Sequence, residues 1–358
     1  MAGGLPPLPA TAGTKVRKAY PKYSSGVAAL PAATSAAFAY ARDISALDTL
    51  YNSTNSWSLG SGANGSVCTC AKRATGELFA LKTCCKLDAL SYAHLRKEAQ
   101  LMAPLRNAFL LTPLKVVDSK GRAASFSMLL ELCPGGDMLQ LLRRQPEKKL
   151  QPAVAAGYCA MVVLGLEALH EAGLAYRDLK PENLLLRANG YLRIADFGLT
   201  APLKECGTTE VGTALYQAPE LIRKQVHGFG VDWWALGVLL LEMLAGASPF
   251  AADDEDATQV AILAHAGGLP ASAPEDGLPP DAAALVGALL QPDVAQRLGS
   301  DAQGGTAAIR QHAWLRETAW AQLADMSAPA PMVPEPLDDA DMDKTLFELT
   351  QRCQSGFD

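Results

Sequence analysis

The residues with the clearest chemical potential lie between Tyr176 and Asn183, where the chain reads YRDLKPEN. This spacing fits the pattern R-D-x-x-x-x-N of a loop that supports phosphoryl transfer. In such chemistry Asp178 could take the proton of an attacking hydroxyl, and Lys180 could neutralise the moving phosphoryl group. Asn183 could hold a metal ion, and the tripeptide DFG thirteen residues later offers Asp196 as a second metal ligand. These four side chains are the first candidates for a catalytic site.

A glycine-rich stretch, GSGANGSV, precedes them at residues 60–67. Its three glycines would let the backbone approach phosphate oxygens closely. The pattern is weak by itself, because G-x-G-x-x-G also occurs in loops that feed directly into a helix and bind dinucleotides. Here the residues after Val67 continue as a strand. The sequence therefore favours a loop folded over a nucleotide between two strands.

Lys82 lies seventeen residues after Gly65, in the next expected strand. A single lysine in a strand is normally a surface residue. This one follows the glycine-rich hairpin, and Glu98 comes sixteen residues later in an expected helix. A buried lysine needs a counter-charge. A Lys82–Glu98 pair could therefore aim the amine at phosphate groups.

Local patterns predict two parts of different character. Short alternating runs between residues 57 and 83, and a compact apolar run at Met128 to Cys133, predict strands joined by tight turns. A short helix is expected from Ser91 onwards. Longer helical patterns follow at 152–171, 231–246 and 282–291. A small sheet-rich part therefore precedes a larger helical part, and no internal repeat is apparent.

The first 42 residues contain five Lys or Arg residues and no acid, and they are rich in Ala, Pro, Ser and Gly. We expect residues 1–45 to be a disordered tail. An organelle transit peptide is the alternative, since such peptides are also rich in serine and poor in acids. Eight cysteines without a CxxC pair or a secretory signal indicate reduced thiols. The expected compartment is the cytoplasm, with the nucleus as a second option.

The overall composition excludes some classes of protein. The chain has 358 residues and a net charge of −6, which argues against a protein that coats nucleic acid or an anionic membrane. Its longest uncharged apolar run, Pro152 to Leu166, has 15 residues and is short for a membrane span. We expect a buried helix there. Ten acids and no Lys or Arg lie within residues 225–296, a solvated face that could also attract basic partners.

In this order and with this spacing, the motifs resemble those of a eukaryotic protein kinase from about Trp57 to Trp314. Tyr176 in place of the usual histidine, Lys180, VDWWALG at 231–237 and QRLG at 296–299 resemble the AGC group. Within that group, MLLE at 128–131, HAWL at 312–315 and the final SGFD resemble the cyclic-nucleotide-dependent kinases.

This resemblance implies an α+β bilobal protein-kinase fold. It places a small antiparallel-sheet N-lobe with one key helix at 54–131, and a larger, mainly helical C-lobe at 134–314. The kinase domain would span 54–314, and a C-terminal tail of the AGC type, residues 315–358, would wrap the small lobe. Phe347 lies where the family's tail aromatic approaches the adenine pocket, unless it is only a scattered apolar residue of the tail.

The resemblance also implies ATP and Mg²⁺ as cofactors. Lys82, held by Glu98, would contact the phosphates, Asn183 and Asp196 would bind Mg²⁺, and Asp178 and Lys180 would be catalytic. Further residues would line the nucleotide site from the glycine-rich loop, the neighbouring strand, the hinge and the tail. These are Gly60, Ser61, Gly62, Gly65, Val67, Ala80, Leu130, Glu131, Cys133, Asp137 and Phe347.

By the same resemblance, the acceptor would be a serine or threonine in a protein, as Lys180 and Thr213 indicate. Asp137, Glu182 and Glu242 match the positions that hold arginines two and three residues before the acceptor. Carboxylates suit guanidinium groups because the pairing can be bidentate. We therefore expect protein substrates with basic motifs.

Thr209 occupies the family's activation-loop position, 13 residues after Asp196 and 11 before Glu220. A phosphate there would add nearly two negative charges and would need cations to order the loop. Arg177 adjoins Asp178, and His94 lies one turn before Glu98, so both could hold it. Thr208 is the neighbouring alternative. The loop could also be ordered without any phosphate.

Three departures from the family pattern bear on function. Asn64 replaces the usual aromatic at the loop tip, and Ala214-Leu215 replaces the usual Pro-Glu, which removes one acidic substrate contact. Too few residues precede the domain for fused cyclic-nucleotide modules, so such regulation would need a separate regulatory chain. An upstream kinase is the other expected partner. A non-catalytic nucleotide-binding scaffold and a small-molecule phosphotransferase are the alternative functions.

Overall fold

The structure is a computed structural model that describes residues 40–41, 51–52, 58–62, 65–119, 124–274 and 277–335. The chain divides into two compact units, Met1–Ala37 and Phe38–Asp358. All the described residues belong to the second unit. The expected tail at 1–45 and the residues after 335, including Phe347, lie outside the described residues apart from the short strand Tyr40–Ala41.

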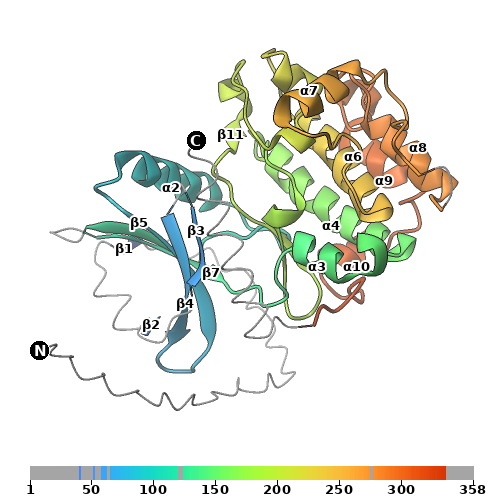
Figure 1. Cartoon of the computed structure of the whole chain (residues 1–358). Coiled ribbons are helices and arrows are strands. Elements are labelled where there is room, and N and C mark those ends of the chain that lie inside the picture. Colours follow the sequence, from blue (N-terminus) through green and yellow to red (C-terminus); the bar gives the residue numbers. More distant parts are fainter. Residues whose placement is uncertain are drawn as a thin grey trace, which may run out of the picture. The chain divides into compact units, whose positions relative to one another are not determined.

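The N-terminal part of this unit is built on one sheet with the strand order β1-β6-β7-β5-β4-β2, and β3 pairs with β4 (Figure 1). The pairs β2–β4, β3–β4, β4–β5, β5–β7 and β6–β7 are antiparallel, whereas β1 pairs with β6 in parallel. The bounds are β1 Tyr40–Ala41, β2 Tyr51–Asn52, β3 Ser58–Gly62, β4 Gly65–Lys72, β5 Leu78–Cys85, β6 Lys115–Asp118 and β7 Ser125–Glu131.

Glycine is required where β4 begins. Gly65 has a φ of +108°, and a Cβ atom at this position would lie 2.4 Å from the carbonyl oxygen of Thr83 on β5. No L side chain fits this backbone conformation or this space. The glycine therefore fixes where the hairpin β3–β4 turns back over β5.

Helix α2, Ala89–Met102, packs against the sheet on β5 and β7. Asp88 caps its N-terminus, because its Oδ1 accepts a hydrogen bond of 3.1 Å from the backbone N–H of Ser91. The buried face carries Leu95, Glu98 and Met102 at helical spacing. This spacing directs Glu98 toward the sheet, where Lys82 of β5 lies.

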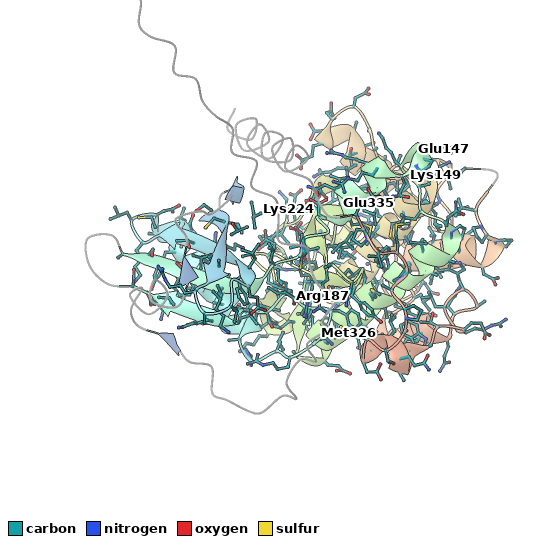
Figure 2. The ribbon with its side chains drawn as sticks, turned by 90° about the horizontal axis from the view of Figure 1, so that it is seen from below. Glu147, Lys149, Arg187, Lys224, Met326 and Glu335 are labelled. Atoms are coloured by element: carbon teal, nitrogen blue, oxygen red, sulfur yellow. The ribbon has the colours of Figure 1, made fainter. Side chains whose placement is uncertain are left out.

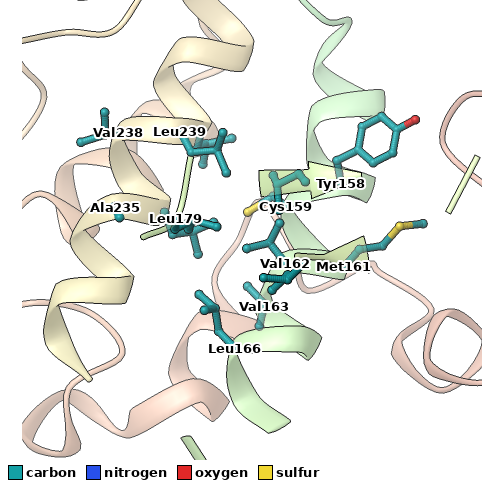
Figure 3. Close-up of a cluster of buried hydrophobic side chains, with 14 of the residues drawn as sticks. Tyr158, Cys159, Met161, Val162, Val163, Leu166, Leu179, Ala235, Val238 and Leu239 are labelled. Atoms are coloured by element: carbon teal, nitrogen blue, oxygen red, sulfur yellow. The ribbon is translucent and has the colours of Figure 1, made fainter. Parts of the chain in front are cut away.

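The C-terminal part is organised around two buried helices, α4 Pro152–Glu171 and α6 Gly230–Ala245. Figure 3 shows side chains of both helices meeting with Leu179 of the loop that carries the catalytic motif. Helix α4 is long and apolar enough to cross a membrane by length and composition, but most of it is buried in this core. The expected buried helix at 152–166 is confirmed.

Shorter helices surround this core: α3 Met138–Arg144, α5 Pro219–Ile222, α7 Glu255–Ala264, α8 Pro280–Leu289, α9 Gly305–Gln311 and α10 Trp320–Ala324. Single 3₁₀ turns lie at Pro146–Lys148, Pro181–Asn183, Leu203–Glu205, Ala214–Tyr216 and Asp301–Gln303. Two small antiparallel pairs, β8 Leu174–Ala175 with β11 Ala201–Pro202 and β9 Leu184–Leu186 with β10 Leu192–Ile194, flank the catalytic motif.

A buried ion pair links α5 to the end of the domain. Arg297, fully buried, donates to both carboxylate oxygens of Glu220 at 2.7 and 3.0 Å and to the carbonyl oxygens of Gly230 and Gln291. A bidentate pair of this kind holds several segments in one geometry. The α+β class with a sheet part before a helical part agrees with the sequence prediction, and the cysteines of the described residues are all free thiols.

Candidate active site

Asp178 lies at the centre of a polar cluster formed by the catalytic loop. Asn183 donates to its Oδ2 at 2.8 Å, and the Nζ of Lys180 lies 3.0 Å from the same oxygen. The hydroxyl of Thr213 lies 3.3 Å from Oδ1 and accepts a 2.9 Å bond from Lys180. Burial raises the pKa of Asp178, while Lys180 and Asn183 act against this shift. The carboxylate faces a hydroxyl, a cation and an amide, as a group that positions an acceptor hydroxyl must.

The buried carboxylate of Asp232, on α6, holds this loop from below. It accepts hydrogen bonds from the backbone N–H of Tyr176 at 2.9 Å and of Arg177 at 2.7 Å, and His170 contributes a third contact at 2.8 Å. Arg177 has a φ of +69°, which is uncommon for a residue with a side chain. Two charge-assisted bonds to adjacent N–H groups can sustain this backbone strain.

Lys82 is buried between two carboxylates. Its Nζ lies 2.9 Å from Glu98 on α2 and 3.2 Å from Asp196. Burial alone lowers the pKa of Lys82, but the two carboxylates outweigh it, so the net pKa is raised and the amine stays charged. Glu98 also accepts from the backbone N–H of Phe197. The predicted Lys82–Glu98 pair is thus formed, and it touches the segment that carries Asp196.

Asn183 and Asp196 offer oxygen donors of the kind that Mg²⁺ prefers. The Asp196 side chain is 44% exposed, and the Asn183 amide nitrogen is engaged with Asp178, which leaves the amide oxygen to face elsewhere. The backbone links the two residues, because the N–H of Ala195 donates to the carbonyl of Asn183 at 2.8 Å. Two protein ligands suit an ion that completes its shell with phosphate oxygens and water.

The expected nucleotide wall is an apolar surface between the sheet and the hinge. Ala80 and Leu130 pair directly across β5 and β7, and they share one apolar cluster with Val67 and Cys133. Burial raises the pKa of Cys133 to about 12, so it is a neutral thiol. For Gly60, Ser61 and Gly62 the structure describes the backbone of β3 alone, with Gly62 paired to Gly65, and Asn64 lies outside the described residues.

The Glu131 side chain does not face this wall. Its two oxygens accept bonds of 2.6 Å from Arg187 and of 2.6 Å from Arg193, so only its backbone is available to a nucleotide. Arg187 also donates to the sulfur of Met326 at 3.2 Å, and Figure 2 marks both residues. The following segment is held by Tyr191, which donates to the carbonyl of Ala328, and by Tyr158, which donates to that of Met332.

The three acids predicted to bind substrate arginines influence one another electrostatically. Asp137 caps α3 by accepting from the N–H of Gln140 at 2.8 Å, and burial, with the charge of Glu182, raises its pKa to about 6. Burial also raises the pKa of Glu242, and Glu182 again adds to the effect. Glu242 accepts a 2.5 Å bond from the hydroxyl of Tyr216. Neighbouring carboxylates that disfavour one another's charge form a site where cations bind well.

The predicted regulatory residues are not in contact. Thr209 and His94 are both exposed, and among the described residues neither makes a hydrogen bond with Arg177. Instead Lys97 of α2 lies 3.4 Å from Glu205, which connects this helix to the segment before Thr209. The Arg177 side chain contacts the carbonyl of Leu199 and the ring of His227.

Sequence reasoning did not identify three residues of this site. Asp232 was part of a quoted motif, VDWWALG, and an acid within that apolar run was an available signal. The lysine and glutamate that join α2 to the activation segment are 108 residues apart and carry no pattern. His227 likewise gave no signal.

The comparisons with known proteins match the geometry of this site. The family model described as protein kinase domain matches residues 54–315. A cAMP-dependent protein kinase, catalytic subunit-like, of Caenorhabditis elegans is 33% identical over 282 residues, which cover 77% of this chain and 67% of that protein. The cAMP-dependent protein kinase catalytic subunit of Dictyostelium discoideum is 33% identical over 280 residues, covering 77% and 42%. Human ribosomal protein S6 kinase alpha-4 is 35% identical over 307 residues, covering 82% and 39%. The chain thus spans about two thirds of the first relative and less than half of the other two.

Proposed function

Because the chain belongs to the protein kinase family, as a serine/threonine kinase of the AGC type, we propose that this site transfers the γ-phosphoryl group of ATP to a serine or threonine hydroxyl of a protein. The observation that carries the proposal is the convergence of Asp178, Lys180 and Thr213 within 3.3 Å. Lys82, paired with Glu98, reaches Asp196 from the sheet.

Each of these residues has a separate task in the proposed reaction. Asp178 orients the acceptor hydroxyl and accepts its proton, and Lys180 stabilises the charge on the phosphoryl group. Lys82 positions the phosphates, and Glu98 keeps the amine in place. Asn183 and Asp196 would hold Mg²⁺, which neutralises charge on the phosphate oxygens. Alignment and charge stabilisation, rather than covalent chemistry, then lower the barrier.

The test compares Asp178→Asn with the unaltered protein in transfer to a protein substrate and in binding of ATP. Asp178 contacts the acceptor side, so transfer should fall about 10²-fold or more while ATP affinity stays nearly the same. Transfer at the unaltered rate would refute the assignment. If the unaltered protein binds ATP and transfers nothing to any peptide, the non-catalytic scaffold is the better description.

We also propose that preferred substrates carry arginine two and three residues before the acceptor. The support is the acidic group of Asp137, Glu182 and Glu242, whose mutual effects on pKa indicate a site that gains from a bound cation. A peptide array with Arg→Ala at each position measures the preference. Equal phosphorylation of the peptide that lacks both arginines would remove the idea.

Activation by phosphorylation of Thr209 is a further proposal. Thr209 is exposed and lies three residues after Cys206, which is buried and anchors the segment by its contacts with the carbonyls of Ala201 and Pro202. An accessible hydroxyl next to a fixed point suits a modification that orders a loop. Phosphatase treatment and Thr209→Ala should both lower activity. Full activity of Thr209→Ala, with Thr208 shown by mass spectrometry to be unmodified, would contradict this.

Partners and compartment are proposed on more general grounds. Two of the relatives named above carry the words catalytic subunit in their names, which supports a separate regulatory chain for this protein. Size-exclusion chromatography of the protein from its own cells, with and without cyclic nucleotide, would test it, since a mass that never changes speaks against such a chain. For the compartment we propose the cytoplasm, and microscopy of the full chain and of the chain without residues 1–45 distinguishes this from import into an organelle.

A further inference from the structure

Arg177 stands where three segments meet. Its backbone N–H donates to Asp232 on α6, and its carbonyl lies against Gly212, where a Cβ atom would approach it to 2.7 Å. Its Nε donates to the carbonyl of Leu199 at 2.9 Å. Movement of this residue would therefore displace the adjacent Asp178 as well as the segment that leads to Thr213.

One nitrogen of the guanidinium faces a histidine. The Nη1 of Arg177 lies 3.3 Å from the Nε2 of His227, a residue of the loop between α5 and α6 that is 6% exposed. Throughout the described parts of the chain, no carboxylate forms an ion pair with Arg177. The carbonyl of Leu199 and the ring of His227 are the acceptors that the described residues provide.

The neighbours of His227 fix its protonation state. Its Nδ1 lies 3.3 Å from the carbonyl of Gln225, which can only accept, so Nδ1 carries the proton. Its Nε2 faces a guanidinium, which can only donate, so Nε2 must be the bare, accepting nitrogen. The two contacts together require the neutral ring. A second proton on Nε2 would place two donors and two positive charges face to face.

We propose that His227 is a positioning residue, which in its neutral form holds the Arg177 side chain and so keeps Asp178 and the Gly212–Thr213 segment in register for transfer. This inference rests on the proposed function. Protonation of the ring breaks the contact, releases Arg177 and lowers turnover. The device makes the catalytic loop sensitive to mild acid without any change in the nucleotide site.

The charges around His227 support this sign of response. Burial lowers its pKa, and Arg177 lowers it further, whereas the carbonyl of Gln225 and the charges of Glu220 on α5 and Asp232 on α6 act the other way. The net effect is a pKa below the ordinary histidine value. The ring is therefore neutral at neutral pH, and protonation begins only as the pH falls into the acidic range.

The kinetic test uses two substitutions. His227→Gln supplies an amide oxygen that can accept from Arg177 but does not titrate, whereas His227→Leu fills the space without an acceptor. At neutral pH, His227→Leu should lower kcat about tenfold with KM for ATP unchanged, and His227→Gln should restore most of it. Between about pH 7.5 and about pH 5, kcat of the unaltered protein should fall more steeply than that of His227→Gln. His312→Gln is the matched control, because His312 also has a burial-lowered pKa but contacts the backbone of Trp314 instead.

A second measurement does not depend on activity. The chain has five histidines, so NMR of the ring carbons can follow each, and the signal missing in His227→Gln is that of His227. Arg177→Met should raise the pKa of His227, because a neighbouring positive charge is removed. An unchanged titration in Arg177→Met, or equal kcat values for the Leu and Gln proteins, would overturn the proposal. Absence of any transfer by the unaltered protein would instead refute the proposed function, and the NMR result would still stand or fall alone.

Discussion

Arginine recognition by this protein should weaken in mild acid, and Asp137 should be responsible for part of the effect. Burial and the nearby charge of Glu182 raise the pKa of Asp137 to about 6. The carboxylate is therefore almost fully ionised at about pH 7.5, and about one molecule in ten carries the charge at about pH 5. Ion pairing with a substrate guanidinium needs the ionised form. KM for an arginine peptide should rise up to about tenfold over this interval.

The matched variant is Asp137→Asn. Asparagine is as good an N-cap as aspartate, so α3 should keep its first turn, which the Asp137 carboxylate now caps through the N–H of Gln140. At saturating ATP, the variant should show a raised KM for the arginine peptide already at about pH 7.5, with a smaller further rise in acid. A peptide with alanine in place of the arginines should show neither effect. If the KM ratio of the two proteins is the same at both pH values, titration of Asp137 does not control recognition.

The same pKa makes a second, independent statement about stability. An acid whose pKa is raised by folding binds its proton more tightly when folded, so its ionisation costs stability above about pH 6 and not below its ordinary pKa of 3.8. Asp137→Asn should therefore melt at a higher temperature than the unaltered protein at about pH 7.5, and this advantage should disappear at about pH 4. An advantage of the same size at both pH values would refute the reasoning.

Three other substitutions test the supports of the site. Lys82→Met leaves Glu98 buried without its cation and should cost about 3 kcal/mol of unfolding free energy, which adding Glu98→Gln should largely restore without restoring transfer. Gly212→Ala, at a φ of +93° and 2.7 Å from a catalytic-loop carbonyl, should lower kcat about tenfold or more, whereas Gly207→Ala, with open space around it, should not. Glu220→Gln should cost about 3 to 5 kcal/mol in chemical denaturation, since its fully buried arginine partner loses its counter-charge, and a cost below about 1 kcal/mol would contradict this.

Features coded by nearby residues were predictable from the sequence. The helix expected at 152–171 begins and ends at the residues of α4, because a proline opens it and its apolar run is long and uninterrupted. The Lys82–Glu98 contact was also predicted, since a buried lysine needs an acid and the expected helix offered one. In each case a short stretch of sequence contains both the cause and the element.

Features set by distant packing were not predictable in the same way. The parallel pairing of β1 with β6 depends on two residues of a very short strand, far too few for any periodic pattern. The side chain of Glu131 belongs to an expected nucleotide-binding stretch, yet it binds Arg187 and Arg193, which are more than fifty residues away. Its motif position fixed the backbone, and tertiary neighbours decided the side chain.

Arg177 shows why the regulatory arrangement in particular escapes the sequence. The motif around Asp178 places a cation beside the catalytic residue, and any good acceptor can satisfy a guanidinium: a phosphate, a carbonyl or a neutral imidazole. Nothing local selects among them, because His227 lies fifty residues further along the chain. The selection is made by α6, whose Asp232 fixes the Arg177 backbone and so determines which acceptors the side chain reaches. Motifs therefore predict which residues do the chemistry, while the acceptor that controls them has to be found in the packed structure.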